Sequence, residues 1–131
     1  MTDIKRNGLF NQKREIYVGV YNPTEAEILA VAAVANLPER SLVTNVYTNV
    51  LTASGTASSQ ITVKVGAVAV ATNVAVATTG IKTTTTPGYF ATGGEITIIG
   101  GTTPPANGAL VVEVVIEYVE LDKTSGEYTA Y

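Results

Sequence analysis

The strongest constraint on the fold is a strict alternation of apolar and other side chains near the C-terminal end. Every second residue from Leu110 to Tyr118 is apolar, whereas Glu113 and Glu117 have the opposite parity. A period of two places these two sets on opposite faces of a β-strand. We therefore expect a strand over residues 109–121, with one face in a core and the other facing water or a basic partner.

The same period, with a high content of Val, Thr and Ile, recurs along most of the chain. It predicts further strands near residues 15–21, 43–52, 61–65, 68–76 and 96–98, separated by loops rich in Gly, Pro, Ser and Thr. Short strands with frequent turns are typical of an all-β sandwich of jelly-roll or Greek-key type, here with about eight strands. No crossover helices are evident, so a parallel α/β sheet is not expected.

Residues 24–37 fit two structures. Thr24 and Glu27 match the pattern of a capping box, and the Ala-rich run that follows favours a helix. Alternate residues from Ile28 onward also lie on one face of a strand. Because the segment is short and lies among strands, we expect a strand from about Ile28 to Ala35, with the helix as the alternative.

The composition argues against catalysis. The chain has 131 residues, enough for one domain, and contains neither Cys nor His. The commonest general base, the thiol nucleophile and the commonest metal ligands are therefore missing. Glu113 and Glu117 would lie about 14 Å apart on one strand face, too far for either glycosidase mechanism. We expect no enzymatic activity, no catalytic or metal-binding residue and no cofactor.

Charge is scarce and unevenly placed. Charged residues make up 15% of the chain, whereas soluble domains average roughly 25%. Such a neutral surface suits a protein that packs against other proteins. Lys5, Arg6, Lys13 and Arg14 lie in the first 14 residues, while the C-terminal end is acidic. The basic start fits either a solvated tail or an arm that docks on an acidic partner.

Neither nucleic acid nor a membrane is an expected partner. Four basic residues without interleaved aromatics make a weak nucleic-acid patch. No apolar run approaches the roughly 20 residues of a membrane span. The first 15 residues also lack a continuous apolar stretch, so we expect no signal peptide.

The two ends carry apolar residues in polar surroundings. We divide the chain into an N-terminal arm (1–14), a β-sandwich domain (15–121) and a C-terminal tail (122–131). Short apolar anchors on extended arms are a common way to hold one subunit against its neighbours. The expected partner-binding residues are Ile4, Lys5, Arg6, Leu9, Phe10, Tyr128 and Tyr131.

Two stretches resemble small virion structural proteins of tailed bacteriophages. They are VANLPERSLVTNVYTNVLTASGTASSQITVKVG, residues 34–66, and GGTTPPANGALVVEVVIEYVEL, residues 100–121. In that group an LP turn leads into a long strand, a Thr/Ala/Ser loop, an ITVKVG-like strand and a closing strand that ends in Glu-Tyr. The resemblance spans about Val34 to Leu121 and contains no invariant chemistry, and the N-terminal arm lies outside it.

The resemblance implies a function on a capsid. It implies a β-sandwich that decorates or cements the exterior of a phage shell, working as a trimer or dimer bound to the major capsid protein. No catalytic residue carries over. The alternative is a receptor- or glycan-binding module of a phage fibre or adaptor. That module would need an exposed aromatic cluster, for which Tyr89 and Phe90 are the candidates.

Overall fold

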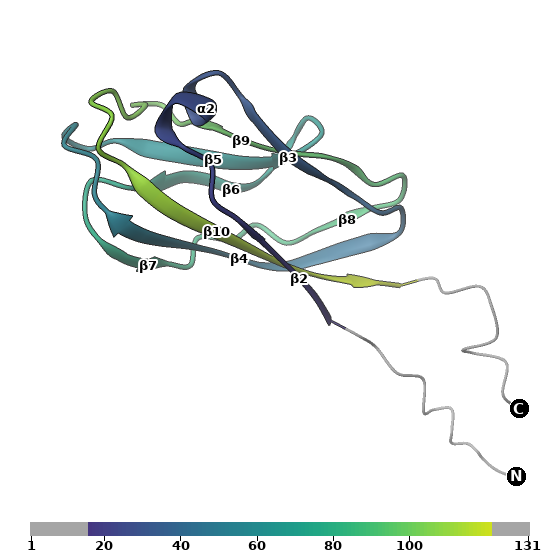
Figure 1. The fold of residues 1–131 in the computed structure, drawn as a ribbon. Helices are drawn as coiled ribbons and strands as arrows, with labels where there is room; N and C mark the ends of the chain where they lie inside the picture. Colours follow the sequence, from purple (N-terminus) through teal and green to yellow (C-terminus); the bar gives the residue numbers. More distant parts are fainter. Residues whose placement is uncertain (1–15, 122–131) are drawn as a thin grey trace, which may run out of the picture.

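The computed structural model describes residues 16–121, so the predicted arm and tail lie outside the described residues. Within this range two antiparallel sheets pack face to face, and a short helix lies at one end of the sandwich (Figure 1). The predicted all-β sandwich is confirmed. The elements are β2 (Ile16–Tyr21), α2 (Glu25–Leu29), β3 (Ala32–Leu37), β4 (Ser41–Thr52), β5 (Gln60–Val65), β6 (Val68–Ala75), β7 (Gly80–Lys82), β8 (Gly88–Phe90), β9 (Gly94–Gly100) and β10 (Val111–Glu120).

The strand order is that of a jelly roll. One sheet has the order β2-β10-β4-β7, with β8 also paired to β4, and the other has the order β3-β9-β5-β6. Because β7 and β8 pair with opposite ends of β4, they act as one interrupted strand. The eight strands then alternate between two sheets in the order of a double Greek key. Consecutive strands cross from sheet to sheet, except for the β5–β6 hairpin.

The core lies between the sheets and consists of aliphatic side chains. Val112, Val114 and Ile116 of β10 are buried, as their alternation predicts. A bulge in β4 brings Val43 and Val46 to the same buried face, although they are three positions apart in the sequence. The bulge lies where Glu117 pairs with Asn45 and Tyr118 with Val43.

Residues 24–37 contain both of the structures that their sequence allows. The strand predicted from Ile28 to Ala35 is wrong in its first part, because Glu25–Leu29 forms helix α2 and β3 begins only at Ala32. The capping box decides this: the amide of Glu27 donates to Thr24 Oγ1 at 3.2 Å, and the amide of Thr24 donates to Glu27 Oε1 at 2.7 Å. The helix then buries Ile28 in the core.

Removing the capping hydroxyl should weaken this corner of the fold. We expect Thr24→Ala to lower the free energy of unfolding by about 1 kcal/mol, because the Glu27 amide loses its acceptor. Urea unfolding followed by circular dichroism measures the change. Thr24→Ser, which keeps the hydroxyl, is the control and should stay near the parent value; an equal loss in both variants would argue against the cap.

The two long flanks of the sandwich differ. On one flank the segment between β7 and β8 closes the gap, since Thr85 Oγ1 bonds the backbone of Val46 in β4 and the Thr86 amide donates to the carbonyl of Val70 in β6. On the other flank β2 and β3 are the outermost described strands of their sheets. The second flank is therefore the open one.

Candidate interaction surface

The face of the five-stranded sheet that points away from the core is apolar, and we call it the outer face. Most of the large apolar side chains that are exposed among residues 16–121 lie on this face. Large exposed apolar patches mark sites of protein interaction. The exposed members on the outer face are Ile16, Val18, Val20, Leu51, Ile81, Tyr89 and Val111.

Strand register assembles these side chains into rows. Val115 of β10 lies directly between Val20 of β2 and Tyr47 of β4. A second row joins Val119 in the same way to its neighbours on β2 and β4, Ile16 and Leu42. Directly opposed residues have their Cβ atoms about 5 Å apart, so each row is a continuous apolar ridge.

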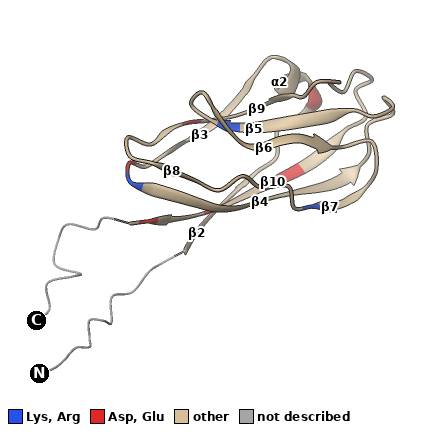
Figure 2. Ribbon diagram, turned by 180° about the vertical axis from the view of Figure 1, so that it is seen from behind, with Lys and Arg blue, Asp and Glu red and all other residues tan. Residues whose placement is uncertain are grey.

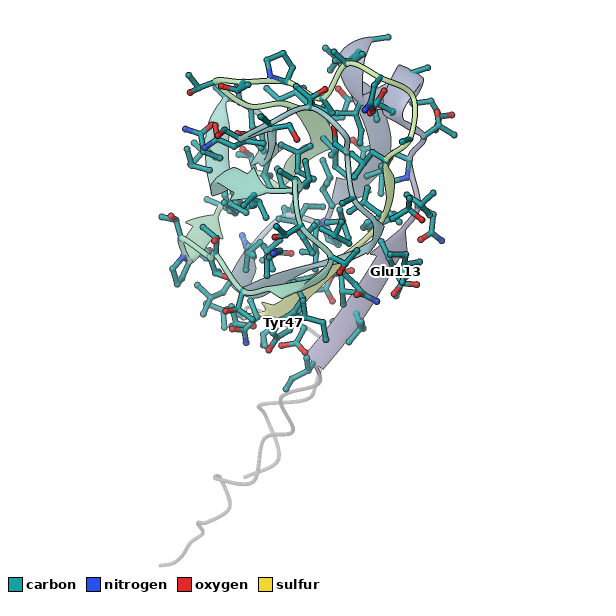
Figure 3. All side chains as sticks on the ribbon, turned by 90° about the vertical axis from the view of Figure 1, so that its left-hand side faces the viewer. Tyr47 and Glu113 are labelled. Carbon is teal, nitrogen blue, oxygen red and sulfur yellow. The ribbon has the colours of Figure 1, made fainter. Side chains whose placement is uncertain are left out.

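The charges of the outer face are all of one sign. Among the outward residues in the described strands of the five-stranded sheet, the charged ones are Glu113 and Glu117. Asn45 Nδ2 donates to Glu117 Oε1 at 3.0 Å, which leaves the charge of that carboxylate in place. Figure 2 shows how few charged residues the sandwich carries, and Figure 3 labels Tyr47 and Glu113 of this face. The outer face therefore combines apolar ridges with negative charge.

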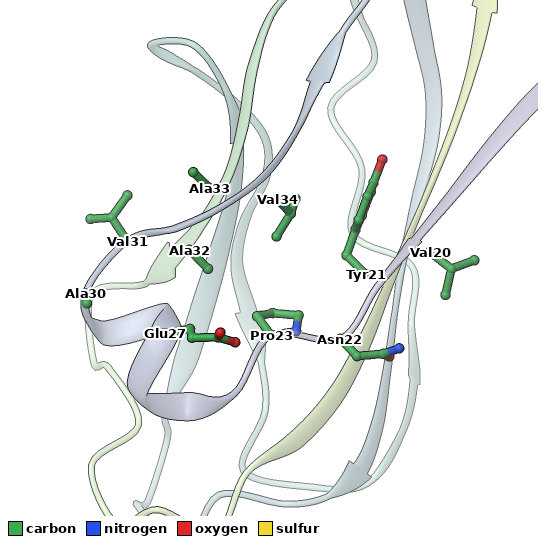
Figure 4. Close-up of a pocket in the computed structure, with 10 residues that line it drawn as sticks. All are labelled: Val20, Tyr21, Asn22, Pro23, Glu27, Ala30, Val31, Ala32, Ala33 and Val34. Atoms are coloured by element: carbon green, nitrogen blue, oxygen red, sulfur yellow. The ribbon is translucent and has the colours of Figure 1, made fainter.

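A cleft lies at the open flank beside this face. It has a volume of about 490 Å³ and is bordered by the end of β2, by α2 and by β3. Tyr21 from β2 and Val34 from β3 lie on facing sides of it (Figure 4). Burial raises the pKa of the Tyr21 hydroxyl above its ordinary value, so that group remains a neutral hydrogen-bond donor in the cleft.

Gly19 lies on the inward face of β2, beneath the side chain of Tyr21. A Cβ atom at Gly19 would overlap the hydroxyl of Tyr21, which folds back over this position. The inward face of β2 therefore carries Tyr17, Gly19 and Tyr21, and Tyr17 stacks on Tyr118 with ring centroids 5.3 Å apart. As a result the aliphatic residues of β2 face outward, where Val18 is 55% exposed.

The aromatic cluster considered for a glycan-binding module does not form. Tyr89 is exposed on the outer face, whereas Phe90 is half-buried and packs against the core. Adjacent residues of β8 point to opposite sides of the sheet. They cannot share one stacking platform.

The described residues hold little reactive chemistry. Residues 16–121 contain no cluster of three potential metal-ligating side chains. Glu25 is buried, and its Oε1 accepts from the Gly108 amide, which ties the 101–110 loop to α2. No helix in this part of the chain is long and apolar enough to cross a bilayer.

The partner-binding residues predicted from the sequence, those of the arm and tail, lie outside the described residues. The outer face itself was not predicted. Its one sequence signal is that β2, Ile16–Tyr21, has no charged or amide side chain on either parity. A strand with two apolar faces at the edge of a sheet indicates a surface that another chain covers.

This architecture and surface define a small jelly-roll domain with an apolar outer face. No family model matches the sequence, and no curated protein matches it. Among solved structures, the chain is similar to one in the acidic stable capsid structure of Helicobacter pylori bacteriophage KHP30. The TM-score is 0.56, the sequence identity is 17%, and the match covers 82% of this chain and 89% of that chain. The two proteins share their fold over nearly their whole lengths.

Proposed function

We propose that this chain is a non-enzymatic structural protein of a bacteriophage capsid, of the decoration or cement type. It binds the exterior of the shell, contacts the major capsid protein and works as a dimer or trimer. The observation that carries this proposal is the shared fold with a chain of a phage capsid over 89% of that chain. Jelly rolls also serve other functions, so the surface must supply further support.

Two further observations support it. The outer face is an apolar patch with little charge, which a protein free in solution would need to cover. Coverage of 82% of one chain and 89% of the other means that the two are of similar length. A chain of about this size is therefore present in that phage capsid structure. A shell-binding interface of this kind should bury roughly 1,000 Å² or more.

The arm and tail are the proposed anchors. Ile4, Leu9 and Phe10 provide apolar contacts in the arm, and Lys5 and Arg6 provide charge. In the tail, two aromatic side chains provide the contacts, Tyr128 and Tyr131. Their partners are neighbouring virion subunits, both the major capsid protein and other copies of this chain.

Binding to closed particles tests the proposal. The full chain is mixed with DNA-filled capsids from which it has been stripped, and the pellet is analysed after sedimentation. We expect saturable binding to the filled particles, and this binding reports on the exterior because a closed shell exposes only that side. The bound chain should also raise the melting temperature of the shell. Absence of binding, or binding without a thermal shift, would overturn the cement role.

Deletion variants then test the anchors. We expect removal of residues 1–14, and separately of residues 122–131, to reduce the bound fraction. Circular dichroism of each variant controls for folding. Undiminished binding after either deletion would exclude that segment as an anchor.

A further inference from the structure

We propose that the outer face of the five-stranded sheet is the docking site for the N-terminal arm, residues 1–14, of a neighbouring copy of this chain. The inference goes beyond the proposed function, because it concerns how copies hold one another and not how they hold a shell. It assigns the arm to the neighbour and leaves the tail and the other surfaces for contact with the capsid.

The charges of the two parts are complementary. The outer face of the five-stranded sheet carries two carboxylates, Glu113 and Glu117. Lys82 of β7 pairs with Thr48, whose parity is the buried one, so this cation does not belong to the outer face. The arm has the opposite sign: its charged residues are Asp3, Lys5, Arg6, Lys13 and Arg14. A cationic segment on an anionic face is the arrangement that Coulomb attraction favours.

The apolar groups match as well. The arm interleaves its cations with Ile4, Leu9 and Phe10. The outer face offers ridges such as Val20, Val115 and Tyr47, flanked by the two glutamates. An extended segment that places aliphatic and aromatic side chains on these ridges would bring its basic residues close to the carboxylates.

The arm is also long enough. Strand β10, the central strand of this face, has 10 residues and spans about 33 Å. The arm has 14 residues and reaches about 46 Å when extended. It can therefore run the length of a neighbour's sheet and still have roughly four residues to cross between the two domains.

The sequence before β2 favours a neighbour over the chain's own sheet. An arm that covered its own outer face would have to reverse direction just before Ile16. Residues 12–15, Gln-Lys-Arg-Glu, include none of the Gly, Pro, Asn, Asp or Ser residues that dominate tight turns. On this ground we assign the arm to a neighbouring copy, and the chain's own sheet is the alternative that the experiment distinguishes.

Cross-linking of single-cysteine variants tests this assignment directly, because the chain has no Cys of its own. A size-tagged Phe10→Cys chain is mixed with a Tyr47→Cys chain and oxidised. We expect a tagged heterodimer on a non-reducing gel, since a bond between these two variants must join two copies. The control partner is Val68→Cys, at an edge of the other sheet and 54% exposed, and should cross-link far less.

Sedimentation equilibrium of the full chain gives the second readout. We expect association that weakens with salt, disappears without residues 1–14, and becomes roughly tenfold weaker in Glu113→Gln/Glu117→Gln. Val18→Lys should also weaken it, because a cation on the outer face repels the arm. The matched controls are Glu95→Gln and Val68→Lys, both exposed on the other sheet, and should leave association unchanged.

Three results would overturn the inference. A monomer at all concentrations leaves no neighbour to dock on. Association that survives deletion of residues 1–14 means that the copies meet without the arm. A cross-link within the Phe10→Cys/Tyr47→Cys double variant, with none between mixed single variants, means that the arm lies on its own sheet. No shell is present in these measurements, so their failure is distinct from failure of the capsid role.

Discussion

Replacing Ile116 with Ala should lower the free energy of unfolding by about 2–5 kcal/mol. Ile116 is fully buried on β10, the strand between β2 and β4. The substitution removes three carbon atoms from a position that both sheets enclose, and a cavity remains because the neighbouring strands cannot close around it. A loss of this size is a large part of the roughly 5–15 kcal/mol that stabilises an ordinary domain.

The adjacent residue provides a matched control. Val115 is half-buried and points to the outer face, so Val115→Ala should cost about 1 kcal/mol or less in the dilute monomer. Urea unfolding followed by circular dichroism suits both variants, since the chain has no Trp. Equal costs at the two positions would contradict the burial difference between the faces. Val115→Ala should instead weaken association between copies.

The sequence was most informative where one face of a strand is buried and the other is polar. In β10 the alternation of Val and Ile with Glu113 and Glu117 predicted both the strand and its buried face. The jelly-roll class followed from the number of such strands and their turns. The pairing of strands could not be predicted, because β10 pairs with β2 and β4, which are distant in sequence.

Residues 24–37 show why local patterns were insufficient. The capping box of Thr24 and Glu27 and the alternation that begins at Ile28 were both genuine signals. The chain accommodates both because Val31 takes a φ of 70° and turns the backbone from the helix into β3. A β-branched residue rarely adopts this conformation, so no sequence rule places a helix end there.

The outer face was missed for a physical reason. When both parities of a strand are apolar, alternation does not reveal which side is buried, as in Ile16–Tyr21. In the structure Gly19 and Tyr21 face inward, and the Tyr21 side chain occupies the space above the glycine. In β4 the bulge at Thr44 shifts the parity midway along the strand. Such details appear only when the strands are paired.

Replacing Thr85 with Val should lower the free energy of unfolding by about 2 kcal/mol, because two backbone groups of Val46 lose their partners. The Val46 amide donates to Thr85 Oγ1 at 2.9 Å, and the same hydroxyl donates to the Val46 carbonyl at 3.1 Å. Valine has nearly the same shape as threonine, so the packing stays and only these bonds are removed. Hydrogen exchange at the Val46 amide should accelerate in parallel.

Two controls separate this bond from general effects on the loop. Thr85→Ser keeps the hydroxyl and should retain most of the stability, and Thr84→Val changes an exposed neighbour and should have little effect. Unchanged exchange at Val46 in Thr85→Val would contradict the bridging role. If the loss is as expected, Thr85 holds together the flank that lies opposite β2 and β3. The chain's own backbone occupies that flank. A second copy can therefore contact the open flank, beside β2 and β3, and the outer face next to it.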